Sequence, residues 1–73
     1  MIIDDLEKMG TDVAEAARKV EWAPYDNVKG FEDMTDSERR AQIDFFVDMF
    51  TNRFFLDSEI EAIRQYAYEQ HNC

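Results

Sequence analysis

Apolar residues are concentrated between Thr35 and Leu56, a stretch that contains five of the six phenylalanines of the chain. Their spacing matches an α-helix, and the apolar positions cover an arc of roughly 200° around its axis. A helix that packs on one side needs an apolar stripe of only about 100°. We therefore expect a central helix over residues 36–51 that neighbouring elements cover on two sides. The expected inward positions are Ile43, Phe45, Phe46, Val47, Met49 and Phe50.

A second helical pattern occupies residues 3–21, with apolar side chains on one face and charged side chains on the other. Gly10 falls on the apolar face. A glycine at this position indicates either close approach of another helix or a break in the helix. In the second case Thr11 would cap a second helix. We favour a single helix that can bend at Gly10. Ala23-Pro24 predicts the end of this helix, because the residue before proline is driven out of the α region.

The local signals for helix starts are clearest in the second half of the chain. Thr35 and Glu38 have the spacing of a capping box, in which each side chain binds the backbone N–H of the other. Ser58 and Glu61 repeat that spacing and predict a third helix over residues 58–70. Its expected inner face consists of Leu56, Ile60, Ile63 and Ala67. The residues after it should fray, as chain ends commonly do.

Residues 22–34 show no helical periodicity, although they contain enough apolar side chains to lie over a core. Connections of this length are uncommon in compact domains and are usually functional or partly structured. The pattern does not distinguish a short helix from a short pair of strands. The predicted fold is all-α: one domain over residues 1–73, with three helices and a long structured connection between the first and the second.

Size and cysteine content limit how such a domain can be stabilised. A chain of 73 residues buries only about 60% of its unfolded surface and is marginally stable alone. Cys73 is the only cysteine, so no internal disulfide can form, and the lone His71 cannot complete a zinc site with it. Phenylalanine packing or assembly into a homo-oligomer is expected to supply the missing stability.

The charge balance indicates which partners suit this protein. Seventeen acidic residues against eight basic ones give a net charge of −9. This field repels phosphates and anionic membranes, so we expect neither direct nucleic-acid binding nor membrane binding. It attracts basic protein surfaces, although acidity can also serve solubility alone. The sequence has no apolar run of about 18 residues and no signal-peptide pattern, and its unpaired cysteine favours the cytoplasm.

No motif for chemistry is complete in this sequence. Counting an EF-hand from Asp26 places Gly30 fifth rather than sixth. Cys73 and His71 are close in sequence, but they belong to an end expected to be mobile. With Gly10 and Gly30 as the only glycines, no phosphate-binding loop exists. We therefore expect no catalytic residues, no metal and no cofactor, and hence no enzyme.

Two surfaces remain as candidate binding sites. The first is an acidic, aromatic segment, in which rings would anchor a partner and carboxylates would attract it. It comprises Trp22, Tyr25, Asp26, Phe31, Glu32, Asp33 and Asp36. The alternative is that these aromatic residues only cover the core. The second is an acidic ridge, Asp44 and Asp48, whose carboxylates could stand in for backbone phosphates; its alternative is an ordinary solvated helix face.

The leading hypothesis is a small acidic protein that binds a basic surface of another protein, such as a nucleic-acid-binding enzyme. Small size, acidity, helicity and the lack of motifs are typical of phage-encoded inhibitors of host nucleic-acid enzymes, so we expect an inhibitor or modulator of that kind. The alternative is a structural or self-assembling helical subunit. In that case a second copy of the chain would bury the surplus phenylalanine surface.

Overall fold

The computed structural model describes residues 2–52 and 54–73. These residues form four α-helices and one short 3-10 helix, and no strand occurs among them. The order is α1 (Ile3–Met9), α2 (Thr11–Asn27), η1 (Phe31–Asp33), α3 (Asp36–Thr51) and α4 (Asp57–Gln70). The all-α class is confirmed. The segment 22–34 contains helical structure rather than a pair of strands.

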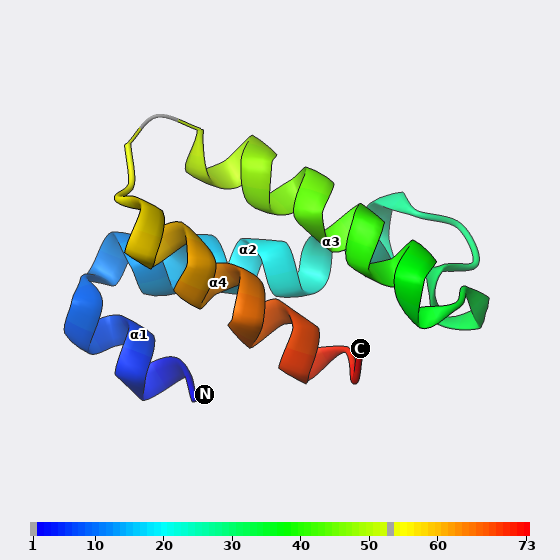
Figure 1. The fold of residues 1–73 in the computed structure, drawn as a ribbon, viewed down its shortest axis with the longest axis horizontal. Helices are drawn as coiled ribbons and strands as arrows, with labels where there is room; N and C mark the ends of the chain where they lie inside the picture. Colours follow the sequence, from blue (N-terminus) through cyan, green and yellow to red (C-terminus); the bar gives the residue numbers. More distant parts are fainter. Residues whose placement is uncertain (1, 53) are drawn as a thin grey trace.

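Helix α2 is the centre of the molecule, and the prediction that α3 takes this place is wrong. α2 packs against α1, α3, α4 and η1, and Figure 1 shows it behind α4, with α3 along the upper side and α1 at one end. The reason is the size of its side chains: four alanines of α2 are buried, and small residues allow neighbouring helices to approach closely. The buried residues of α2 are Val13, Ala14, Ala16, Ala17, Val20, Ala23 and Pro24.

Helix α3 is covered on one side only. Phe46 is 5% exposed, and Ile43 and Val47 are fully buried, whereas Phe45 is 56% exposed and Met49 is 51% exposed. The prediction that Phe45 and Met49 point inward is therefore wrong. Helices α2 and α4 pack on α3, and together they cover less than the full apolar arc.

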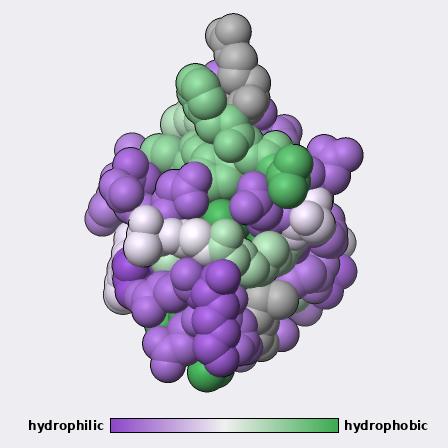
Figure 2. Space-filling view, turned by 90° about the vertical axis from the view of Figure 1, so that its left-hand side faces the viewer, coloured by the Kyte–Doolittle hydropathy of each residue, from purple (hydrophilic) through white to green (hydrophobic). Residues whose placement is uncertain are grey.

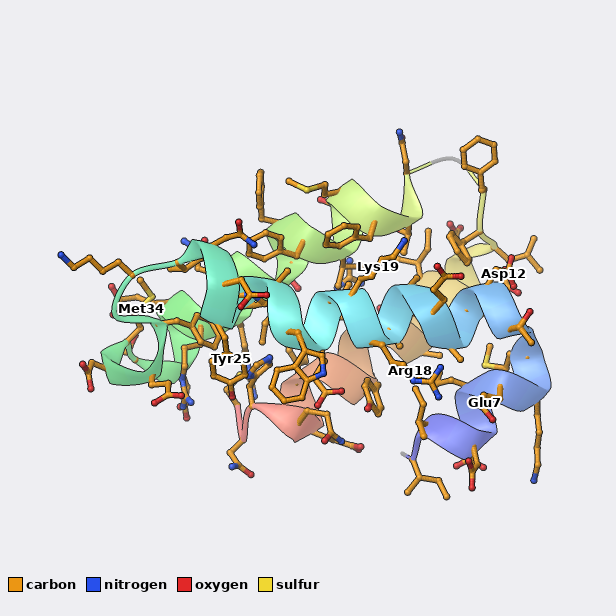
Figure 3. The ribbon with its side chains drawn as sticks, turned by 180° about the vertical axis from the view of Figure 1, so that it is seen from behind. Glu7, Asp12, Arg18, Lys19, Tyr25 and Met34 are labelled. Carbon is orange, nitrogen blue, oxygen red and sulfur yellow. The ribbon has the colours of Figure 1, made fainter. Side chains whose placement is uncertain are left out.

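Gly10 separates α1 from α2, so the single helix over residues 3–21 is also wrong. Its φ of 147° is a conformation that residues with a side chain rarely adopt. A Cβ atom at this position would lie 2.6 Å from Oδ1 of Asp12. The chain reverses at this position. Arg18 of α2 donates a hydrogen bond of 2.7 Å to Glu7 of α1, and Figure 3 shows these two side chains near each other.

Helix α2 continues through Pro24 to Asn27, beyond its predicted end. A proline inside a helix removes one backbone hydrogen bond. The Asn27 side chain donates to the carbonyl of Ala23 at 2.8 Å, and the Pro24 ring is fully buried. Burial of this ring offsets the lost bond. As a result, Trp22, Tyr25 and Asp26 belong to α2 and not to a connecting loop.

The two predicted helix starts have different outcomes. Thr35 and Glu38 form the capping box, with Glu38 N donating to Thr35 Oγ1 at 3.2 Å and Thr35 N donating to Glu38 Oε1 at 3.1 Å. Helix α4 begins one residue earlier than predicted, where the Glu59 carboxylate accepts from the backbone N–H of Leu56 at 2.8 Å. Leu56 is 68% exposed and does not belong to the inner face of α4.

Candidate protein-interaction surface

The predicted aromatic and acidic segment folds as the last two turns of α2, a turn, and η1. Trp22 is 58% exposed and Tyr25 is 42% exposed, and their ring centroids are 5.8 Å apart. Trp22 and Asp26 are four residues apart on a helix, so they lie on the same face. Gly30, with a φ of 73°, allows the chain to turn from α2 into η1.

Phe31 is not available to a partner. It is 3% exposed and packs edge to face on Tyr25, with ring centroids 5.8 Å apart. The alternative that the aromatic residues only cover the core is therefore correct for Phe31. It does not hold for Trp22 and Tyr25, which keep a large part of their rings in solvent.

His71, predicted to lie in a frayed end, is instead buried and packs against two aromatic rings of this surface. It is 3% exposed, and its ring centroid lies 4.9 Å from that of Tyr25 and 5.0 Å from that of Phe31. Its backbone carbonyl accepts a hydrogen bond of 2.9 Å from Nη1 of Arg39. Burial lowers the pKa of His71. No periodic signal in the sequence could place residue 71 beside residue 25.

The acidic side chains of the segment are mostly available for contact. Asp26, Glu32 and Asp33 are exposed, and none of them forms an ion pair within the described part of the chain. Asp36 differs, because it forms an ion pair with Arg39. Glu32 and Asp33, together with residues 25, 28, 30 and 31, line a shallow pocket of about 230 Å³. Three carboxylates are thus free to meet cations of a partner.

The predicted Asp44–Asp48 ridge is divided between two environments. Asp44 is half-buried and accepts hydrogen bonds from Arg64 Nε, at 3.1 Å, and from the Tyr68 hydroxyl. Burial and, to a smaller extent, the hydrogen bond to Asp44 raise the pKa of Tyr68 to about 12. Asp44 therefore connects α3 to α4, and its charge is compensated within the protein. Asp48 remains exposed.

A groove of about 430 Å³ lies beside the same part of α2, between α2 and α3. Trp22 and Ala23 contribute to it from α2, and Phe50 contributes from α3. Its charged lining residues are Glu15, Arg18, Lys19 and Asp26. Figure 3 shows Lys19 on the side of α2 that faces α3.

A separate apolar surface lies at the turn between α3 and α4. Phe54 is 82% exposed and Leu56 is 68% exposed. Figure 2 shows apolar residues gathered in the upper part of the face that includes this turn, above a hydrophilic lower part. The prediction that Leu56 lies on the inner face of the third helix is wrong, whereas surplus exposed phenylalanine surface was expected under the self-assembly alternative.

Among residues 2–52 and 54–73, no group of three or more His, Cys, Asp or Glu side chains is arranged to hold a metal ion. No helix formed by these residues has the length and apolar character needed to cross a membrane.

Comparisons of the chain with protein-family models, with curated proteins and with solved structures found no match.

Proposed function

We propose that this protein is a non-enzymatic binding module that docks on a basic surface of another protein. The proposal rests on one observation: the exposed rings of Trp22 and Tyr25 lie in the same segment as Asp26, Glu32 and Asp33, which have no cationic partner in the described part of the chain. Large aromatic residues dominate the binding energy of many interfaces. Carboxylates beside them attract basic partners and favour correct orientation.

The packing of Tyr25 against neighbouring rings also favours binding. Tyr25 packs against both Phe31 and His71, and Phe31 is buried. Side chains that are already held lose less conformational entropy when a partner binds. Trp22, in turn, contacts the Tyr25 ring. The surface therefore needs little reorganisation to accept a partner.

We further propose that the partner is a nucleic-acid-binding enzyme and that the protein inhibits it by occupying its basic surface. The net charge of −9 supports this proposal, because the nucleic acid that such an enzyme binds is also negatively charged. The phage-type inhibitor expected from the sequence is one form of this function. Asp44 would contribute little to phosphate mimicry, because Arg64 and Tyr68 already bind its carboxylate.

The test is affinity capture from a cell lysate with two charge-matched variants. One variant carries Asp26→Lys, Glu32→Lys and Asp33→Lys; the other carries Asp4→Lys, Asp5→Lys and Asp57→Lys. Each reversal adds two charges to the net −9, so both variants have a net charge of −3. Asp36 is left unchanged, because Arg39, its ion-pair partner, also binds the His71 carbonyl.

We expect capture of basic nucleic-acid-binding proteins by the original chain and by the control variant, and its loss in the surface variant. Capture should also fall steeply between about 0.1 M and 1 M salt, because screening shortens from about 10 Å to about 3 Å. Equal loss in both variants would show that net charge, and not this surface, causes binding. Capture that is insensitive to salt would contradict the proposal.

Self-assembly is the second candidate function, favoured by the exposure of Phe45, Met49, Phe54 and Leu56. Exposed apolar surface of this kind commonly marks an interface. Two copies with a net charge of −9 repel each other, so this association should strengthen with salt, opposite to the binding of a basic partner. Sedimentation equilibrium at low and high salt, with Phe54→Ser as the variant, distinguishes the two. A monomer at all salt concentrations would exclude self-assembly.

A further inference from the structure

The groove between α2 and α3 is suited to receive a side chain. Its volume is about 430 Å³, within the range of roughly 300–1,000 Å³ that is common for binding pockets. The Trp22 ring is largely exposed, and Phe50 is half-buried and stacks on Phe46 with ring centroids 6.3 Å apart. Ala23, which is 7% exposed, adds a small apolar side chain to the lining.

The charges that line this groove leave one carboxylate uncompensated. Lys19 Nζ lies 3.5 Å from Glu15 Oε1, and Arg18 forms its ion pair with Glu7 at 2.7 Å. Asp26 has no ion pair within the described residues. An occupant therefore meets the apolar residues Trp22, Ala23 and Phe50, two cations that are already paired, and the single uncompensated negative charge of Asp26.

We propose that this groove holds an apolar side chain of a partner protein while a neighbouring lysine or arginine of the same partner pairs with Asp26. The inference rests on the proposed function and specifies the partner segment: an amphipathic, basic stretch of polypeptide. Trp22 and Asp26 are one helical turn apart, about 5–6 Å between Cβ atoms. The apolar and cationic groups of the partner must have a similar separation, as residues three or four apart on a helix do.

A second copy of this chain is a poorer occupant. It would bring a net charge of −9 to a groove whose uncompensated charge is also negative. A basic helix brings the complementary charge and an apolar side chain together.

Trp22 is the only tryptophan of the chain, so its fluorescence reports on this groove. The probes are two synthetic alanine-based helical peptides without tryptophan. The first has one leucine and a lysine four residues later, together with further lysines on the opposite face. The second is identical except that serine replaces the leucine, which leaves the net charge unchanged.

We expect the leucine peptide to shift the Trp22 emission to shorter wavelength and to bind at least about tenfold more tightly than the serine peptide. A tenfold difference corresponds to about 1.4 kcal/mol. Asp26→Asn should weaken binding of the leucine peptide several-fold. Asp33→Asn, which removes the same charge from η1 outside the groove, should weaken it less.

The two proposals fail in different ways. Equal, salt-sensitive binding of both peptides with unchanged Trp22 emission would overturn the groove assignment and leave the proposed basic partner intact. If neither peptide binds, the groove assignment is overturned whatever the lysate capture shows. If capture from lysate also fails, the proposed function is overturned with it.

Discussion

The Nδ1 atom of His71 lies 3.1 Å from the hydroxyl oxygen of Tyr25, a contact between residues 46 positions apart in the sequence. The two rings also pack together, with centroids 4.9 Å apart. Because Tyr25 belongs to the candidate surface, the residues that follow α4 hold this surface in place. Arg39 strengthens the arrangement by donating to the His71 carbonyl.

The buried state of His71 predicts a loss of stability in weak acid. Burial lowers the pKa of His71 from its ordinary value of 6.5, so the unfolded chain takes up a proton more readily than the folded one. The stabilisation is complete above pH 6.5 and is lost as the pH falls toward the lowered value. Glu21 raises the pKa of His71 and Arg39 lowers it, and each of these effects is smaller than that of burial.

The measurement is the melting temperature of the original chain and of His71→Phe between pH 7.5 and pH 5.5. Phenylalanine keeps the ring contacts but does not titrate, and Tyr25, which is 42% exposed, can bind water through its hydroxyl instead. The melting temperature of the original chain should fall more than that of the variant. Parallel pH profiles would show that His71 does not cause the acid sensitivity.

Adjacent phenylalanines of α3 should respond very differently to truncation. Phe46 is 5% exposed and Phe45 is 56% exposed. Phe46→Ala should cost about 3–5 kcal/mol, the usual range for a buried aromatic residue, which would leave a chain of this size largely unfolded. Phe45→Ala should cost less than about 1 kcal/mol. Urea unfolding followed by circular dichroism checks both; similar losses would contradict the one-sided packing of α3.

The capping box at the start of α3 should make a measurable contribution. Thr35→Ala removes the oxygen that accepts from Glu38 N and should cost about 1 kcal/mol, or about 4–8 °C in melting temperature. Ser37→Ala is the matched control, since Ser37 is exposed and has no side-chain hydrogen bond in the described part of the chain. A control that melts as low as Thr35→Ala would argue against the cap as the cause.

Two tyrosines of α4 should lose their hydroxyl protons at a higher pH than an ordinary tyrosine does. Burial is the main cause, and it raises the pKa of both Tyr66 and Tyr68 to about 12. A hydrogen bond from Tyr66 to Glu21 and one from Tyr68 to Asp44 add to this effect. Because the folded pKa exceeds the unfolded value of about 10, the neutral tyrosines stabilise the fold below pH 10. This stability is lost as the pH rises through about 12.

Tyrosinate absorbance, recorded during an alkaline titration, measures these values. Tyr68→Phe should remove one late-titrating group and leave the other, which belongs to Tyr66. Three tyrosines that all titrate near pH 10 would contradict the bonds to Glu21 and Asp44.

The sequence alone determined the features that depend on near neighbours. Helical periodicity is a property of short segments, so the all-α class and the ranges of α3 and α4 were predictable within a residue or two. The Thr35–Glu38 cap was predictable because both partners lie within one turn. The aromatic and acidic character of residues 22–33 also followed from composition. Its tryptophan, its tyrosine and its three carboxylates are indeed exposed.

Only the tertiary structure decided which side chains are covered and which helix is central. Periodicity gives the direction of Phe45 and Met49 around α3, but not the number of helices available to cover them. Local rules likewise predicted a helix end at Pro24, which burial of its ring overrides. The pairing of Asp44 with Arg64, 20 residues later, and of Tyr25 with His71, 46 residues later, depends on how the helices pack. No short-range pattern contains that information, because each contact exists only after distant segments have met.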